Sequence, residues 1–252
     1  MIPENIQQRE EYIFEQVLSG NFVAKWTDLH KEVNGRRLRL QVMEDALIVD
    51  GVRVNVSAKL SQKLADVFDA SLPTCAVADM MYAAAVRRAV PCPTPVTTTT
   101  AAMIRHSQAV DKQLVNQSPT GLVSTCGKHW VLDKQLESRP QKACTYGWHF
   151  SGSSFQGIKG YQPATLHAGT GVNLIQPNWC GHDMLHVDYS QVCQLVSQTC
   201  HVDDVEVRFS DMLKDPSLAH LVSHQGILKI DRQPGTIPHT GTIVLFPVHI
   251  TP

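Results

Sequence analysis

The side chains best suited to chemistry gather in two short stretches, 147–149 and 176–190. The first reads Gly-Trp-His, and the second contains His182, His186 and Asp188. Two histidines four residues apart share one face of a helix, whereas on a strand all three of these side chains would point to the same side. Either conformation brings imidazoles and a carboxylate together, which is a combination used in acid–base and metal chemistry.

A catalytic zinc site needs three protein ligands and one open position, and the metal lowers the pKa of a bound water to about 7. We predict that His149, His182 and Asp188 are these ligands, or that they act as acid–base groups without a metal. The run 182–186 departs from the His-Glu-x-x-His pattern of zinc proteases, because Asp183 is shorter than the glutamate that serves there as general base. A polar loop with locally hydrogen-bonded histidines is the alternative interpretation.

Neighbouring residues would complete a pocket around these groups. Tyr189 or Ser190 would donate a hydrogen bond to negative charge developing on oxygen. Trp148 and Trp179 would form rigid apolar walls, and Lys128 would place a cation at the mouth. A structural hydroxyl at Ser190 and a solvated turn at Lys128 are the competing interpretations, since no Gly-x-Ser-x-Gly motif frames the serine. The predicted catalytic residues are His149, His182, Asp188, Tyr189 and Ser190, and the predicted substrate-binding residues are Trp148, Trp179 and Lys128.

The order of these motifs resembles a family of functionally uncharacterised bacterial proteins. The resemblance lies in Gly-Trp-His149, in Ile-Gln-Pro at 175–177, and in His182 followed by Asp-Tyr-Ser at 188–190. It extends over most of the chain through segments at 19–22, 72–74, 202–203 and 213–216 and through the threonine-rich helix start that leads to His106. It implies positions rather than a reaction: His149, His182, Asp188, Tyr189 and Ser190 would belong to the site. His186 lies outside the family pattern, which favours the trio His149, His182 and Asp188.

Cys75 supports a second hypothesis, in which the nucleophile is a thiolate. It follows Pro-Thr at the expected start of a helix, and a helix N-terminus lowers the pKa of a thiol. A cysteine followed by a later histidine is the order of papain-like hydrolases, so His149 or His182 would be the base and Asp188 would orient it. The alternative is a buried thiol on an alanine-rich helix, because papain-type flanking residues are absent. The seven cysteines, an odd number without a Cys-x-x-Cys pair, predict reduced thiols.

These residues predict a hydrolase that cleaves an amide or ester bond in a small-molecule or peptide substrate. In one form of this hypothesis the enzyme depends on zinc. A metal-free enzyme that uses Cys75 or Ser190 with the same histidines is one alternative. A non-catalytic domain whose tryptophans and histidines line a ligand groove is the other. Elemental analysis and thiol labelling distinguish the two enzymatic hypotheses, and binding without turnover would indicate the third.

Composition excludes several other classes of function. The net charge is −1 and no segment concentrates basic residues, so a nucleic-acid partner is not favoured. The chain has no glycine-rich phosphate loop, which argues against a nucleotide cofactor. No window approaches the roughly 18 apolar residues of a membrane span. The segment 1–11 lacks the basic and apolar regions of a signal peptide, so we expect a cytoplasmic location.

The pattern of elements predicts an α+β fold for a single domain that covers residues 1–252. A chain of this length can bury most of its apolar surface in one core. Residues 1–118 form a mostly helical part and 119–252 a mostly β part, so we expect N-terminal helices and a β-hairpin packed on a mainly antiparallel sheet. We expect helices at 4–18, from a cap at Ser57, at 75–89, at 99–115 and after Ser210, with strands within 37–56 and at 122–125, 130–132, 145–150, 172–175, 192–202, 226–230 and 243–246.

Two local patterns are the strongest of these. Asp50-Gly51 lies between two apolar β-branched runs, and such a pair supplies the positive φ angles of a two-residue hairpin turn. Ser57 and the run 97–100 offer side-chain caps to the helices that follow them. The glycine- and threonine-rich stretch 151–171 is predicted to be a long loop, and such loops in compact domains are often functional.

Overall fold

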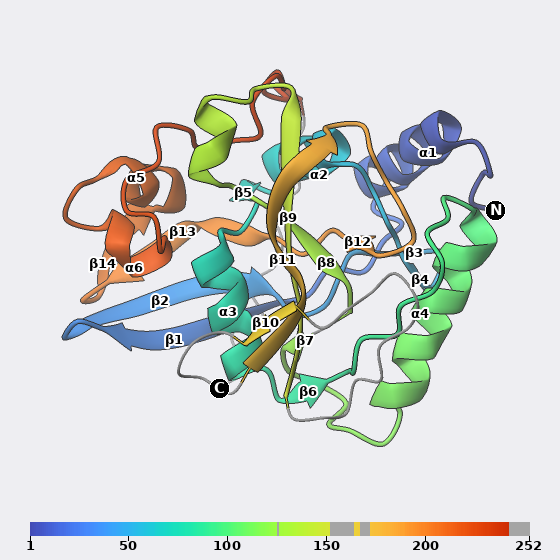
Figure 1. Cartoon of the computed structure of the whole chain (residues 1–252), viewed down its shortest axis with the longest axis horizontal. Coiled ribbons are helices and arrows are strands. Elements are labelled where there is room, and N and C mark those ends of the chain that lie inside the picture. The colour runs from blue at the N-terminus through green and yellow to red at the C-terminus, as the bar shows by residue number, and fades with distance from the viewer. Residues whose placement is uncertain (125, 152–163, 167–171, 242–252) are drawn as a thin grey trace.

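The computed structural model describes residues 1–124, 126–151, 164–166 and 172–241, which form an α+β fold with mainly antiparallel strands (Figure 1). The helices are α1 (Ile6–Leu18), α2 (Ala58–Val67), α3 (Cys75–Ala84), α4 (Thr100–Leu114), α5 (Phe209–Lys214) and α6 (Ala219–Val222), with a short 3₁₀ helix at Lys134–Glu137. The predicted α+β class is therefore confirmed.

Side-chain caps fix where three of the helices begin. The hydroxyls of Ser57, Thr74 and Thr99 accept hydrogen bonds from the backbone N–H groups of the first turns of α2, α3 and α4. The caps at Ser57 and Thr99 confirm the sequence prediction. Helix α3 ends at Ala84 rather than near residue 89, because the chain leaves the helix to form β6 (Arg87–Arg88), which pairs with β7 (Val123–Ser124).

The first sheet has the order β1-β2-β13-β14, and β5 also pairs with β13. Its strands are β1 (Trp26–Val33), β2 (Arg36–Met43), β5 (Ala70–Ser71), β13 (Val196–Val202) and β14 (Val205–Arg208). The sequence did not predict β1, because Leu29 is its one fully buried residue and an edge strand of this kind shows little apolar alternation. The predicted hairpin is confirmed: β3 (Ile48–Val49) and β4 (Val52–Arg53) flank Asp50 and Gly51, whose φ angles are 51° and 73°.

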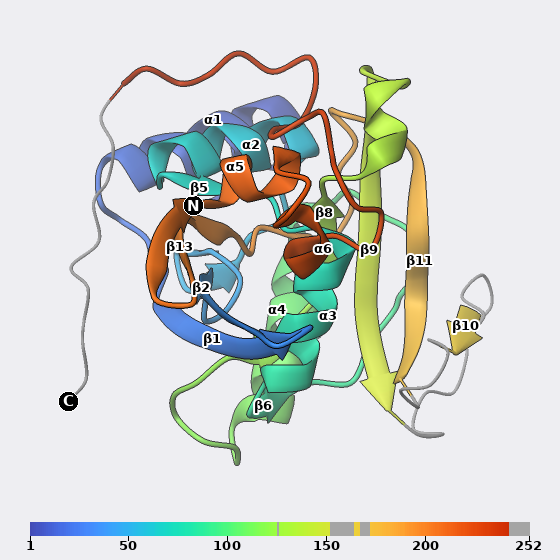
Figure 2. The same ribbon diagram turned by 90° about the vertical axis from the view of Figure 1, so that its left-hand side faces the viewer.

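The second sheet carries most of the predicted site residues and has the order β10-β11-β9-β8-β12. Its strands are β8 (Lys128–Val131), β9 (Lys142–Ser151), β10 (Ala164–Leu166), β11 (Val172–Asp183) and β12 (Gln191–Val192). The long strands β9 and β11 run beside each other (Figure 2), and in Figure 1 α3 and α4 lie on either side of them. Residues on opposite faces of this sheet therefore meet different helices.

Two residues of β9 interrupt the regular alternation of its side chains. Gly147 and Trp148 have positive φ angles of 110° and 57°. A bulky side chain rarely adopts this conformation, and such outliers concentrate at functional sites. In a regular strand, residues 146 and 149 would face opposite sides. Here Tyr146 and His149 both contact Asp79 of α3, while Trp148 contacts His106 of α4.

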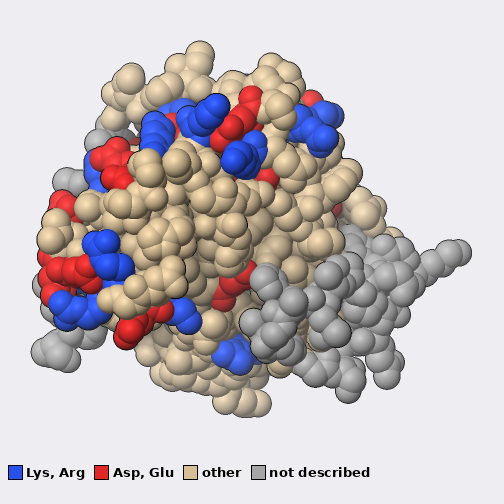
Figure 3. Space-filling view, turned by 60° about the vertical axis from the view of Figure 1, so that its left-hand side comes forward, with Lys and Arg blue, Asp and Glu red and all other residues tan. Residues whose placement is uncertain are grey.

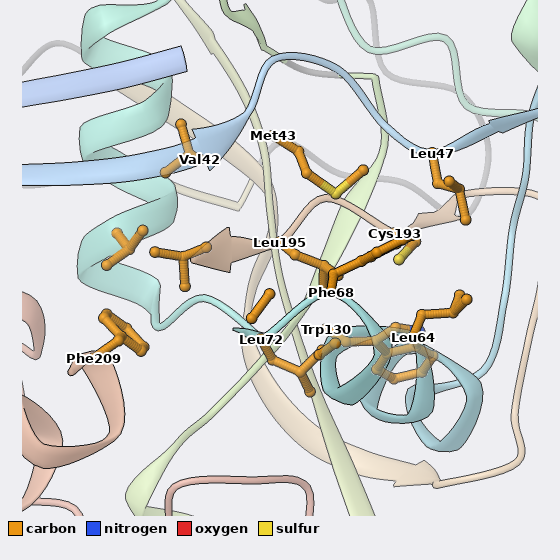
Figure 4. Close-up of a cluster of buried hydrophobic side chains, with 14 of the residues drawn as sticks. Val42, Met43, Leu47, Leu64, Phe68, Leu72, Trp130, Cys193, Leu195 and Phe209 are labelled. Atoms are coloured by element: carbon orange, nitrogen blue, oxygen red, sulfur yellow. The ribbon is translucent and has the colours of Figure 1, made fainter. Parts of the chain in front are cut away.

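A large apolar core lies between the first sheet, α2, α5 and the start of the second sheet (Figure 4). Ten of its side chains are Val42, Met43, Leu47, Leu64, Phe68, Leu72, Trp130, Cys193, Leu195 and Phe209. Trp130 is almost completely buried, and its indole N–H donates to the backbone oxygen of Val56 at 2.7 Å. This hydrogen bond joins β8 to the segment before α2. Because Trp130 also packs in the apolar core, the core supports β8 of the second sheet.

Charged side chains of both signs are interspersed on the face shown in Figure 3. Several form exposed ion pairs, such as Arg37 with Asp204 and Arg208 with Asp69. Exposed pairs of this kind contribute little stability. None of the described helices is long and apolar enough to cross a lipid bilayer.

Four sequence predictions in the second half of the chain have different outcomes. The strand expected at 192–202 is divided between β12 and β13. The strand expected at 226–230 is absent, because this segment makes a single backbone hydrogen bond to α5, from Leu228 N to the oxygen of Leu213, rather than a ladder. The strand at 243–246 and most of the loop 151–171 lie outside the described residues, but 164–166 form β10 rather than part of a loop, because they pair with β11.

Candidate functional site

The structure separates His149 from the other predicted ligands. In the pairing of β9 with β11, His149 lies opposite Leu174, whereas His182 lies opposite Ala143. These positions are six residues apart along β9, or about 20 Å at the rise of a strand. The prediction that His149, His182 and Asp188 form one metal site is therefore wrong, because the extended conformation of β9 and β11 keeps the two imidazoles at different ends of the ladder.

Five residues on the other face of the sheet form what we call the Lys128 cluster: Lys128, His182, His186, Asp188 and Ser190. The Lys128 ammonium lies 3.4 Å from Asp188 Oδ2, and Ser190 donates to Asp188 Oδ1 from both Oγ (2.5 Å) and the backbone N–H (2.8 Å). His186 Nε2 lies 3.8 Å from Asp188 Oδ2, and His182 stacks on His186 with ring centroids 4.1 Å apart. One carboxylate thus contacts a cation and a hydroxyl and lies beside a pair of stacked imidazoles.

The cluster is buried at one end and open at the other. Lys128 and Asp188 are each 3% exposed and Ser190 is fully buried, whereas the side chain of His186 is 32% exposed. Because β11 ends at Asp183 and the chain then turns, His186 folds back onto His182. The four-residue spacing thus does bring these two histidines together, although on a strand end and a turn rather than on a helix.

Burial and charge set the protonation states in the cluster. Burial would raise the pKa of Asp188, but His186, Lys128 and Ser190 outweigh that effect and hold the pKa well below its usual range. Burial lowers the pKa of Lys128, and the Asp188 carboxylate opposes this shift. Burial and the neighbouring His186 lower the pKa of His182 to about 4, so this imidazole is neutral at pH 7.

The three aromatic residues that the sequence prediction placed at the site lie near the cluster in different environments. Trp148 is fully buried near Lys128, whose ammonium lies 6.0 Å from the indole ring centroid. Trp179 is 50% exposed and contacts His182 edge-to-face at 4.6 Å. Tyr189 differs from its predicted role, because its hydroxyl donates to the backbone oxygen of Thr94 at 2.9 Å and accepts from the Thr94 N–H. Tyr189 is therefore engaged with the connector before α4 and is not placed to stabilise an oxyanion.

The interior near the cluster contains polar atoms without a hydrogen-bond partner among the described residues. They are Asn55 Oδ1, His106 Nε2, Thr145 Oγ1, His186 Nε2 and Gln191 Nε2. Gln191 belongs to the cluster's surroundings because its Oε1 accepts from the Asp188 N–H, and Asn55 Nδ2 donates to the Gln191 backbone oxygen. Buried polar atoms in proteins are usually bonded to protein, water or ligand, so these atoms mark a polar interior that can both donate and accept hydrogen bonds.

His149 belongs to a second constellation on the α3 face, which we call the Asp79 cluster: Asp79, Tyr146, His149 and His224. Asp79 accepts hydrogen bonds from His149 Nε2 (2.7 Å), from the Tyr146 hydroxyl (2.8 Å) and from His224 Nε2 (2.9 Å). Burial opposes ionisation of Asp79, but these partners hold its pKa well below the usual range. The ring of Tyr82 stacks on His149 at 4.9 Å. The exposed member is His224, whose pKa is raised by its hydrogen bond to Asp79.

Cys75 begins α3, one turn before Asp79, but its environment does not favour a thiolate. Burial raises the pKa of Cys75 well above its usual value, and the nearby Asp133 and Asp79 carboxylates raise it further. These effects on the pKa outweigh the lowering that the position at a helix N-terminus would cause. Cys75 packs against the apolar cluster that contains Cys144 and Tyr146. The thiol therefore resembles a structural cysteine rather than an activated nucleophile.

We expect Cys75 to react slowly with iodoacetamide at pH 7, about tenfold or more below its rate in the denatured chain, because the thiolate is the reactive form. Peptide mapping after timed labelling measures each cysteine separately. Cys92, with a pKa raised to about 11, provides the internal comparison. If Cys75 were modified faster than Cys92, the papain-like hypothesis would regain support.

The prediction of reduced thiols is wrong for two of the seven cysteines. Cys144 on β9 and Cys180 on β11 form a disulfide across the two strands. Their sulfurs lie beside the buried carboxylate of Asp133, and the three potential ligand atoms are all within 4.8 Å of one another. Among the described residues this group, and not the predicted histidine trio, brings three potential ligand atoms close enough for a metal ion, although its two sulfurs are joined in the disulfide.

Sequence reasoning missed Asp79, His224 and the importance of His186. Asp79 lies 70 residues from His149, and no local motif links them. The four-residue spacing of His186 from His182 did indicate a role for His186. We gave that spacing less weight because His186 lies outside the pattern of the family that the chain resembles. Comparisons of the chain with protein-family models, curated proteins and solved structures find no match, so its assignment to a function depends on the residues of the site.

Proposed function

We propose that this chain is a hydrolase that cleaves an amide or ester bond at the Lys128 cluster. The observation that carries the proposal is the buried Asp188 carboxylate, which lies between Lys128, Ser190 and His186 and leads to a stacked imidazole pair at the surface. Carboxylate, imidazole and a fixed cation are the groups that water activation and charge stabilisation require.

The two histidines differ in their surroundings, which suits them to different roles. His182, with a pKa of about 4, is neutral at pH 7 and can accept a proton from water. The Nε2 atom of His186 lies 3.8 Å from Asp188 Oδ2, so this ring faces the buried carboxylate. Because the rings stack at 4.1 Å, a positive charge on His186 disfavours protonation of His182. The pair can therefore take up one proton and pass it to a leaving group.

Lys128 would stabilise negative charge on the reacting oxygen. Its ammonium is buried at 3% exposure, and a charge in a site that excludes water interacts more strongly than one in solvent. Ser190 donates to Asp188 and keeps that carboxylate in place, so we assign it a positioning role. Trp179, half exposed beside His182, would contact an apolar part of the substrate. This chemistry does not require zinc, because Lys128 supplies the positive charge.

Replacing His182 or His186 by asparagine should lower kcat/KM for hydrolysis by at least about 100-fold, which is the usual contribution of a general acid or base. Nitrophenyl esters and peptide nitroanilides are suitable first probes, assayed with the full chain. His220→Asn is the matched control, because His220 is exposed and lies on α6. Unchanged rates in both His182→Asn and His186→Asn would remove the proposal.

A ligand-binding domain is the second candidate, favoured by the unpartnered polar atoms of Asn55, Thr145 and Gln191. It predicts saturable binding of a small polar molecule, measured by calorimetry, with no product formed. If His186→Asn abolished binding of such a molecule and the wild-type chain never turned it over, binding rather than hydrolysis would be the function of the cluster.

A further inference from the structure

Asp133, Cys144 and Cys180 form a buried group that the proposed hydrolase does not use. Cys144 and Cys180 come from the paired strands β9 and β11, and Asp133 precedes the 3₁₀ helix. All three residues are buried, and a carboxylate oxygen and both sulfurs lie within 4.8 Å of one another. In the disulfide state the two sulfurs are bonded to each other and are not available as thiolate ligands.

The carboxylate of Asp133 lacks a positive partner. Asp133 is 1% exposed, and its oxygens accept from the Gln135 N–H at 2.8 Å and from Asn178 Nδ2 at 2.6 Å. Both donors are neutral, and none of the ion pairs formed within the described ranges includes Asp133. A buried carboxylate without a cation is costly. This is an observation, independent of the sulfurs, that points to a bound cation.

We propose that reduction of the Cys144–Cys180 disulfide creates a site for a divalent thiophilic cation, with Asp133, Cys144 and Cys180 as ligands. A thiol or phosphine reductant supplies two electrons, and two protons complete the conversion of the S–S bond into two thiols. Metal binding then displaces both thiol protons to solvent. A small-molecule disulfide that accepts two electrons and becomes two thiols re-forms the S–S bond and releases the metal, so the redox state of this pair controls metal occupancy.

The ligand set selects the class of cation. Two thiolates and one carboxylate carry three negative charges. A divalent ion therefore leaves a net charge of −1 and provides the positive partner that Asp133 lacks. Thiolates favour zinc and similar soft ions over magnesium and calcium, which prefer oxygen ligands. Zinc with sulfur ligands is tetrahedral, which leaves a fourth position for water or for a nearby side chain. Cys75 packs against the same cluster, and Asn178 Oδ1 lies 3.9 Å from Cys180 Sγ, so these two side chains are the candidates for the fourth position.

Cobalt(II) provides a direct readout, because tetrahedral cobalt–thiolate sites have strong visible and near-ultraviolet absorption bands. We expect the full chain, reduced with a phosphine and freed of metal, to bind one cobalt ion with these bands, and zinc to displace it. The oxidised chain should show no bands. Near-ultraviolet circular dichroism checks that the reduced chain keeps its tertiary structure. Absence of bands in the reduced chain, or loss of tertiary structure on reduction, would overturn the proposal.

Variants assign the ligands. Asp133→Asn keeps the shape of the side chain and should weaken cobalt binding at least about tenfold. The double variant Cys144→Ala/Cys180→Ala should lose the bands. Cys200→Ala is the control, since Cys200 is a buried free cysteine in the first sheet and should not change binding. If the double variant fails to fold, Asp133→Asn decides alone: cobalt affinity equal to that of the wild type contradicts the site.

Discussion

Lys128→Met should lower the free energy of unfolding by about 3–5 kcal/mol, the cost typical of leaving one partner of a buried ion pair uncompensated. The ammonium and the Asp188 carboxylate lie 3.4 Å apart and are each about 3–4% exposed, so solvent cannot replace the lost charge. Methionine keeps the length of the side chain, which limits the contribution of a cavity. Urea unfolding at pH 7.5 measures the change, and Lys142→Met is the control because Lys142 is exposed on β9.

A second substitution separates the effect of charge from that of packing. Asp188→Asn removes the uncompensated carboxylate, so the double variant Lys128→Met/Asp188→Asn should be at least about 1 kcal/mol more stable than Lys128→Met alone. If instead the two single effects added, Lys128 and Asp188 would not be coupled. The rate of hydrolysis should fall in both variants that lack Lys128, because Lys128 is also the cation that we place beside the reacting oxygen.

The parts of the fold that were predictable from sequence depend on local patterns. The hairpin at Asp50-Gly51 follows from the φ angles that its turn requires, and the start of α2 follows from the Ser57 cap. Strand β1 was not predictable, because only Leu29 of its eight residues is fully buried and the strand is held by backbone pairing with β2. Backbone pairing does not depend on residue type, so the sequence of such a strand shows no clear apolar pattern.

The candidate site shows the same division between local and distant information. The spacing of His182, His186 and Asp188 is local, and the structure does place these side chains near one another. The contact of His149 with Asp79 joins positions 70 residues apart. It also depends on the positive φ angle of Trp148, which no alternation pattern predicts. His149 was therefore placed in the wrong cluster for a reason that lies in the backbone of β9.

Acidification should destabilise the fold well before its carboxylates protonate. Burial lowers the pKa of His106 to about 4 and that of His129 to about 3, while an unfolded histidine titrates near 6.5. Between these values the unfolded chain binds more protons than the fold, so stability falls as pH falls. At pH 5 each of the two histidines should lower the free energy of unfolding by about 2 kcal/mol relative to pH 7.5, or by about 4 kcal/mol together.

Urea unfolding at both pH values tests this, with His106→Gln and His129→Gln as variants that should each reduce the loss by about 2 kcal/mol. His224 acts in the opposite sense, since its raised pKa adds stability below its unfolded value that disappears as pH rises. Its effect is small because its side chain is 56% exposed. Asp79 and Asp188, whose pKa values are lowered, stabilise the fold above about pH 4 and lose that contribution only below it. A stability loss confined to pH below 4 in the wild type would show that the two buried histidines do not titrate as their surroundings require.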